Sequence, residues 1–99
     1  MTEASPLGEA RAKESALRAE LAAAVAERAR AGREAERLEG RAALDGADPA
    51  VAEAAATQRR LEAEAAADIS RLRAELRAAE GSVVGLEAAS DVARRTDGD

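Results

Sequence analysis

The chain has 99 residues, 30 of them alanine, and it contains no Phe, Tyr, Trp, His or Cys. Without imidazole or thiolate groups it lacks the usual general bases, nucleophiles and zinc ligands, which argues against an enzyme and against a bound cofactor or metal. A net charge of −5 argues against nucleic-acid binding, because nucleic-acid-binding proteins usually present a basic face.

The sequence also lacks the usual signals of secreted and membrane proteins. Its first residues carry neither a positive leader nor an apolar h-region, so we expect no classical signal peptide. No window approaches the 18 or so uncharged apolar residues of a membrane span. We therefore expect a protein of the cytoplasm or of an assembled particle, with protein partners and with neither a membrane partner nor a small-molecule substrate.

The first predicted element is a helix over residues 6–43, preceded by a disordered start over residues 1–5. Ser5 suits the N-cap and Pro6 the first helical position, where a missing N–H costs nothing. Small and apolar residues then recur at alternating steps of three and four, which is typical of a coiled-coil seam. The seam positions are Leu7, Ala10, Glu14, Leu17, Leu21, Ala24, Arg28, Ala31, Ala35, Leu38 and Ala42.

A turn is predicted over residues 44–48 and a second helix over residues 49–80. Gly46 suits the left-handed residue that closes a helix, and Asp48 with Pro49 repeats the cap of the first helix. Gly81 would close the second helix. The second seam consists of Val51, Ala54, Gln58, Leu61, Ala65, Ile69, Leu72, Leu76 and Ala79. Two consecutive four-residue steps after Leu61 predict a stutter.

Two long helices joined by a short turn predict an all-α fold, an antiparallel two-helix coiled-coil hairpin with an alanine-rich seam. When the chain is folded about residue 46, the numbers of paired residues add to about 93. This register places Leu17 beside Leu76 and Leu61 beside Gly32. Glycine inside a helix costs ~1 kcal/mol relative to alanine, and a close approach of Leu61 to the helix backbone would explain why glycine occupies position 32.

The C-terminal part of the chain allows two interpretations. Residues 81–95 form a short third helix if Gly81 and Gly85 interrupt the second one. Alternatively they extend the second helix, which places Val83 and Leu86 beside Ala10 and Leu7. Residues 96–99 are expected to be disordered.

Two groups of residues are candidate interaction sites. Apolar side chains near the open end of the hairpin should form its most adhesive surface, and they are Leu7, Val83, Val84 and Leu86. Four arginines at steps of three and four share a helix face that would bind an anion or an acidic partner. They are Arg30, Arg33, Arg37 and Arg41. The alternative is a solvated face, because Glu34, Glu36 and Glu39 lie among them.

Two resemblances bear on function. Length, acidity and a mid-chain turn resemble the outline of the small secreted helical hairpins with a Trp-x-Gly turn, but this chain has Leu44-Asp45-Gly46 and lacks that family's C-terminal tyrosine motif. An Ala/Arg/Glu-rich hairpin with an Asp-Gly-x-Asp-Pro turn is similar to small coiled-coil proteins of phage and prophage structural genes. That resemblance implies a virion or assembly component.

Two classes of function follow. The first is a non-enzymatic structural or assembly protein, which self-associates or packs into a larger complex. The second is a regulatory binding module, such as a chaperone, adaptor or inhibitor, which presents its hairpin to one protein partner.

Overall fold

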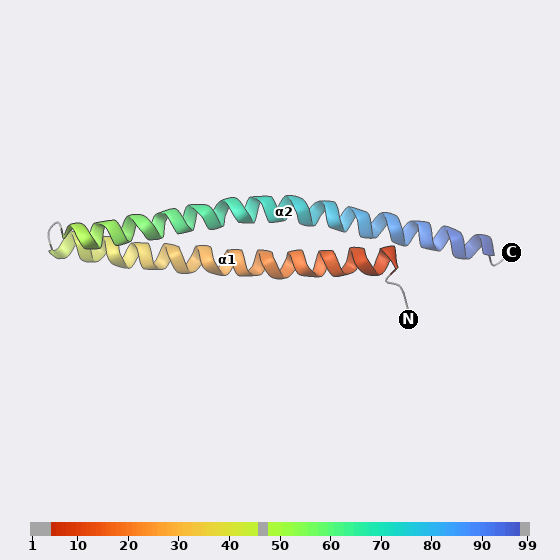
Figure 1. The fold of residues 1–99 in the computed structure, drawn as a ribbon, viewed down its shortest axis with the longest axis horizontal. Helices are drawn as coiled ribbons and strands as arrows, with labels where there is room; N and C mark the ends of the chain where they lie inside the picture. The colour runs from red at the N-terminus through yellow and green to blue at the C-terminus, as the bar shows by residue number, and fades with distance from the viewer. Residues whose placement is uncertain (1–4, 46–47, 98–99) are drawn as a thin grey trace. The chain divides into compact units, whose positions relative to one another are not determined.

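The computed structural model describes residues 5–45 and 48–97, which form two α-helices and no strand. Helix α1 spans Pro6–Asp45 and helix α2 spans Pro49–Asp97. The helices run antiparallel (Figure 1), so the fold is the predicted all-α helical hairpin. The predicted turn residue Gly46 lies outside the described residues, as do residues 1–4 and 98–99 of the two segments predicted to be disordered. The disorder predicted for residues 96 and 97 is wrong, because α2 continues to Asp97.

Both helices begin at the caps that the sequence indicates. The Ser5 hydroxyl oxygen accepts a 2.9 Å hydrogen bond from the backbone N–H of Gly8, and Asp48 Oδ1 accepts one of 3.0 Å from the N–H of Ala50. These side chains satisfy N–H groups that have no partner inside the helix. Each cap is followed by a proline at the first helical position.

The chain divides into two compact units. One unit combines the described parts of residues 1–20 and 72–99, and the other spans residues 21–71. We call them the open-end unit and the turn unit. The buried side chains of the open-end unit are Leu17, Leu72, Ala79 and Val83. Those of the turn unit are Ala31, Ala35, Leu38, Ala55, Ala65 and Ile69.

The seam of α1 is the predicted one, since each of its positions is buried or half-buried except Arg28. The predicted seam positions of α2 are all buried or half-buried as well. The buried face is wider than predicted near the turn, because Ala55 is buried beside Ala54 and Glu62 is half-buried beside Leu61. An uninterrupted four-three alternation without the stutter therefore also runs from Val51 onward. Its members are Val51, Ala55, Gln58, Glu62, Ala65, Ile69, Leu72, Leu76, Ala79, Val83 and Leu86.

One ion pair between the helices reports the register in each unit. In the open-end unit an Arg11 guanidinium N–H donates to Glu87 Oε1 over 3.3 Å, and in the turn unit Arg59 donates to both carboxylate oxygens of Glu39. The residue numbers of these pairs add to 98 in both units. Residues that face each other within the seam have numbers that add to about 93, and residues on one flank of the seam should add to a different but constant sum. Both pairs lie on the same flank and share the sum of 98, so both agree with the predicted register.

Helix α2 does not end near residue 80 but continues to Asp97. The prediction of an end at Gly81 is therefore wrong, and the extension is the observed alternative for residues 81–95. Val83 is only 7% exposed and Leu86 is half-buried, so the seam of the open-end unit continues past the glycine. Packing of an apolar face contributes most of the stability of helices in proteins, and here it outweighs the glycine cost of ~1 kcal/mol.

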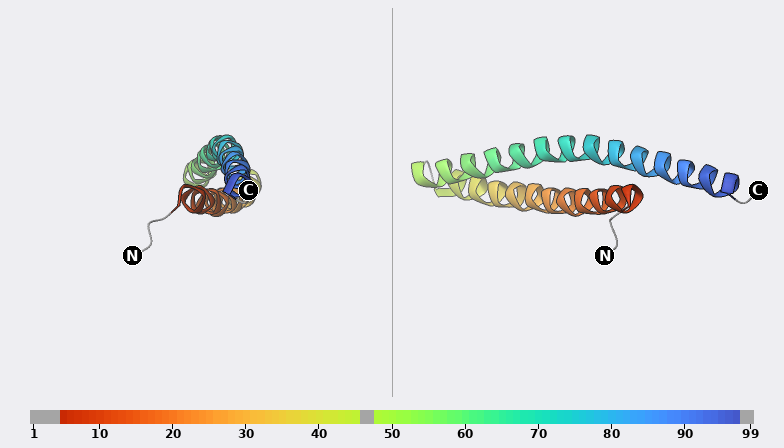
Figure 2. Two further views of the ribbon diagram at one scale, coloured as in Figure 1. Left: turned by 90° about the vertical axis from the view of Figure 1, so that its right-hand side faces the viewer. Right: turned by 45° about the vertical axis from the view of Figure 1, so that its right-hand side comes forward.

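Beyond Leu86 helix α2 extends past the start of α1 in the open-end unit (Figures 1 and 2). Every residue from 87 to 95 is exposed. We call residues 88–97 the overhang of α2. No residue of α1 lies opposite it, and from residue 88 to 95 the side chains of its seam face and of its outer face are both exposed.

Polar residues at the seam keep contact with solvent. The Glu14 side chain is 13% exposed and pairs with Arg18 one turn later, and Arg28 is exposed. Asp68 lies at the edge of α2 and pairs with Arg71 across 3.6 Å. Among the described residues no polar side chain is fully buried, so the desolvation penalty of a buried charge is avoided.

Candidate functional site

The four apolar residues predicted at the open end do not form one exposed surface. Val83 is buried, and Leu7 and Leu86 are half-buried, because all three belong to the seam of the open-end unit. Val84 is 66% exposed and faces away from the seam. The prediction expected the four residues to form one adhesive surface at the open end, whereas three of them pack in the seam.

The exposed apolar side chains of this part of the chain lie instead on the outer face of α2. Val84 and Val92, the latter 62% exposed, are two of four large apolar residues that are exposed among the described residues. They are eight residues apart with Ala88 midway, so they lie along one side of the helix. In a monomeric hairpin this apolar face would remain exposed to solvent.

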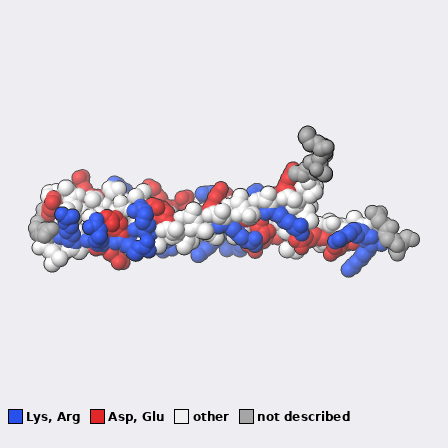
Figure 3. All heavy atoms as spheres, turned by 90° about the horizontal axis from the view of Figure 1, so that it is seen from below, with Lys and Arg blue, Asp and Glu red and all other residues white. Residues whose placement is uncertain are grey.

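The arginine face is largely neutralised by its own helix. Arg30 donates two hydrogen bonds to Glu27, of 3.0 and 2.7 Å, and Arg37 donates two to Glu34, of 3.0 and 2.5 Å. Arg41 is also engaged in an interaction. Arg33 is exposed and has no ion-pair partner within the described residues. The arrangement matches the solvated-face interpretation, and Figure 3 shows basic and acidic side chains interspersed over the visible face.

These pairs shift the titration of both partners. The hydrogen bonds from Arg30 lower the pKa of Glu27, and those from Arg37 lower the pKa of Glu34. The same bonds raise the pKa of each arginine. All four groups therefore stay charged at neutral pH. A second anion could bind these arginines only by competing with a carboxylate that is already bound in a two-bond geometry.

A charge network in the turn unit joins the two helices and was not predicted from the sequence. Arg59 donates to Glu39 on α1 with bonds of 3.0 and 2.6 Å and to Glu62 on its own helix with one of 2.9 Å. The hydrogen bond with Glu39 raises the pKa of Arg59, and it lowers the pKa of Glu39. The sequence signal was available: Glu39 and Arg59 both flank the seam in the predicted register.

Gly32 makes room for this network rather than for Leu61. A Cβ added to Gly32 would lie 2.5 Å from Glu62 Oε2 and 3.5 Å from Glu62 Cδ, and no other atom would come within 4 Å. The prediction that Leu61 approaches Gly32 is therefore wrong. The residue opposite is Glu62, which belongs to the four-three alternation of α2 without the stutter. The Glu62 carboxylate lies over the bare glycine backbone and reaches Arg59 with its other oxygen.

A shallow groove of about 430 Å³ surrounds this glycine in the turn unit. Val25, which is 46% exposed, gives it an apolar end, and the remaining lining is mostly charged. The lining residues are Val25, Arg28, Ala29, Gly32, Arg33, Glu36 and Glu62. Charges of both signs at an open surface favour contact with water over retention of a small ligand.

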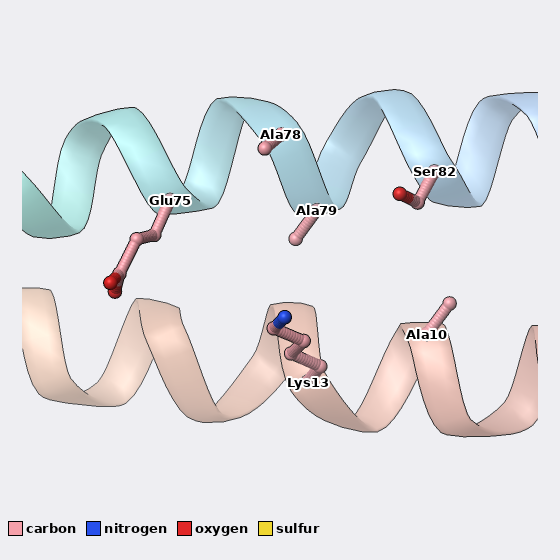
Figure 4. A pocket seen from close by; sticks show the side chains of 6 residues that line it. All are labelled: Ala10, Lys13, Glu75, Ala78, Ala79 and Ser82. Carbon is pink, nitrogen blue, oxygen red and sulfur yellow. The ribbon is translucent and has the colours of Figure 1, made fainter.

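A second groove of about 350 Å³ lies between the two helices of the open-end unit (Figure 4). Ala10 points up from α1, Ala79 points down from α2, and the Glu75 side chain extends from α2 into the space between the ribbons, while Lys13 lies along α1 (Figure 4). The lining residues are Ala10, Lys13, Glu75, Ala78, Ala79 and Ser82. Small side chains from both helices leave room for one apolar side chain of a partner.

The chemistry available to these surfaces is limited. The described residues contain no cluster of three acidic side chains arranged to hold a metal ion, and the chain has no His or Cys. No described helix carries an apolar stretch that would cross a membrane. What the geometry offers is helix faces with apolar and charged side chains, which are the elements of protein–protein contacts.

Comparison with protein families, with curated proteins and with solved structures finds no match for this chain in any of the three. The functional argument therefore rests on the helix faces described above.

Proposed function

We propose that this chain is a non-enzymatic structural or assembly coiled-coil protein that self-associates or packs into a larger complex. The observation that carries the proposal is the overhang of α2, together with the exposed Val84 and Val92 on the same helix. Most of the stability of helices in proteins comes from packing of an apolar face, so a helical overhang with no packed face gains stability from a partner that packs against it.

The composition of the core supports the same proposal. Five of the ten buried side chains among the described residues are alanine, and the others are Leu17, Leu38, Ile69, Leu72 and Val83. Alanine contributes little buried apolar area compared with a leucine or isoleucine, which stabilises by about 1.5–3 kcal/mol when buried. A hairpin with so few large core residues benefits from further burial through association. A place in a phage- or prophage-type particle is the specific form of this proposal that the resemblance of composition and turn favours.

The second candidate function is a regulatory binding module with a single protein partner. The groove beside Ala10 and Ala79 favours it, because this groove would hold one apolar side chain of a partner helix. In this case the isolated chain would remain a monomer at every concentration.

Melting curves at increasing protein concentration test the proposal. We expect the melting temperature to rise with concentration, because association stabilises the folded state by mass action. Val84→Asp combined with Val92→Asp should abolish the rise while leaving the far-ultraviolet signal of helix in place. Val25→Asp is a matched control, since it places the same charge at an exposed valine of the turn unit. A melting temperature independent of concentration in the parent chain would contradict self-association.

A further inference from the structure

The outer edge of α2 in the open-end unit carries three side chains at seven-residue intervals: Arg77, Val84 and Asp91. A seven-residue interval is two helical turns, so the three lie in a row on one side of the helix. All three residues are exposed, and Val84 lies midway between a positive and a negative charge. We call this row the valine edge.

The charges on the valine edge are available to a partner. The Arg77 side chain has no hydrogen bond or ion pair among the described residues. Asp91 accepts a hydrogen bond from Arg94 of its own helix through Oδ1, which leaves Oδ2 for a second donor. The backbone next to Val84 is accessible as well, because a Cβ built on Gly81 or Gly85 would meet nothing within 4 Å.

We propose that the valine edge binds the same edge of a second copy of the chain, with the two α2 helices antiparallel about a two-fold axis at Val84. The proposal rests on the proposed function, and it specifies the partner and the register of the contact. An isologous contact places residues equally distant from the axis opposite each other. Val84 of each copy then meets Val84 of the other, and Arg77 of each copy lies beside Asp91 of the other.

Charge favours the antiparallel direction over the parallel one. In the antiparallel arrangement Arg77 of each copy pairs with Asp91 of the other on both sides of the central Val84 contact, while Arg73 of each copy lies opposite Arg95 of the other at the outer ends of the contact. A parallel pair in register would place Arg77 against Arg77 and Asp91 against Asp91, and like-charge juxtaposition disfavours an interface. The overhang supports the same occupant, because an antiparallel helix would cover part of α2 where α1 is absent.

A single cysteine tests the axis directly, because the chain contains no cysteine of its own. In Val84→Cys the two thiols would face each other across the axis, so mild oxidation should give a covalent dimer of twice the 10.2 kDa chain mass. Ala19→Cys is the matched control: it is exposed on α1, away from the valine edge, and should remain monomeric under the same oxidation. Equal cross-linking of the two variants would overturn the proposal.

Charge reversal tests the register independently of cross-linking. Sedimentation equilibrium from about 1 μM to about 1 mM should show that Arg77→Glu and Asp91→Arg each weaken the dimer by about tenfold or more. The double variant Arg77→Glu/Asp91→Arg restores opposite charges across the axis and should recover most of the affinity. Circular dichroism of each variant checks that the helices are intact.

The outcomes separate this inference from the proposed function. Recovery in the double variant, together with the Val84→Cys dimer, supports the two-fold contact. Self-association that none of these substitutions changes would overturn the two-fold contact and leave the assembly function standing. A chain that stays monomeric over the whole concentration range would overturn both.

Discussion

Gly32 and Gly40 lie in the same helix of the turn unit but in different surroundings. Gly40 has no atom within 4 Å of a built Cβ, whereas Gly32 has the Glu62 carboxylate in that place. Replacing Gly40 by alanine should raise the free energy of unfolding by about 0.5–1 kcal/mol, because alanine restricts the unfolded chain and improves helix propensity. Gly32→Ala should gain less than Gly40→Ala, since the Glu62 carboxylate must move.

Urea unfolding of the two variants and the parent at one protein concentration measures this difference. Glu62 is a flexible side chain, so Gly32→Ala should still fold. A gain at Gly32 equal to that at Gly40 would mean that the Glu62 carboxylate does not occupy the space above the glycine.

Glu39 provides a prediction of pH dependence at a single residue. The Arg59 hydrogen bonds lower the folded-state pKa of Glu39, so this group stabilises the fold above its unfolded pKa of about 4.3. The stabilisation is lost as the pH falls through the lower, folded-state pKa. The difference in unfolding free energy between the parent and Glu39→Gln should therefore be present at pH 7 and shrink at the most acidic pH values.

Unfolding measured at a series of pH values from neutral to strongly acidic checks this expectation. Glu36→Gln is a suitable control, because Glu36 is exposed and has no ion-pair partner in the described part of the chain. A parent-to-Glu39→Gln difference that stays constant down to the lowest pH would show that the pair with Arg59 does not stabilise the hairpin.

At the scale of the helices, the sequence predicts where both helices begin but not where α2 ends. Ser5 and Asp48 mark both starts, because capping is a local interaction between neighbouring residues. Gly81 looked like a stop for an equally local reason. The continuation depends on Val83, which packs in the seam of a unit built from residues far apart in the sequence. Local signals do not carry this tertiary contribution.

The candidate sites were also predictable only where the signal is local. The three-four spacing of apolar residues predicted the seam, but it did not decide whether Val83 or Val84 faces the seam, because that depends on whether α2 continues without a break beyond Gly81. The charge network of Glu39, Arg59 and Glu62 required the four-three alternation of α2 without the stutter, and the predicted stutter placed Leu61 rather than Glu62 opposite Gly32. The neutralised arginines were already implied by the interleaved glutamates, because residues three apart on a helix are neighbours.

Two adjacent valines test the continuation of α2. Val83→Ala should lower the free energy of unfolding by about 1–2 kcal/mol, because the substitution removes two methyl groups from a buried side chain. Val84→Ala removes the same groups from an exposed site and should change the stability of the dilute monomer by less than about 0.5 kcal/mol. Chemical unfolding at low concentration compares them, and equal losses would place both valines on the same side of the seam.

At the scale of the whole molecule, the buried seam and the exposed overhang predict unequal protection of backbone amides. Stability within a protein ranges from almost none at frayed ends to the global value at the core. Amides near Leu38 and Ile69 should exchange most slowly, because these side chains are buried in the turn unit. Amides of the overhang should exchange fastest among the described residues, since every side chain from 87 to 95 is exposed.

Hydrogen exchange followed by mass spectrometry at low and high protein concentration then tests how association and local order are linked. If copies associate through the outer face of α2, peptides that contain Val84 and Val92 should become more protected as concentration rises. Peptides from the middle of the turn unit should change less, because their amides are already protected by the buried seam. Protection of the overhang that is high in the dilute chain and independent of concentration would contradict this expectation. It would mean that the end of α2 is stable by itself and that association is not needed to order it.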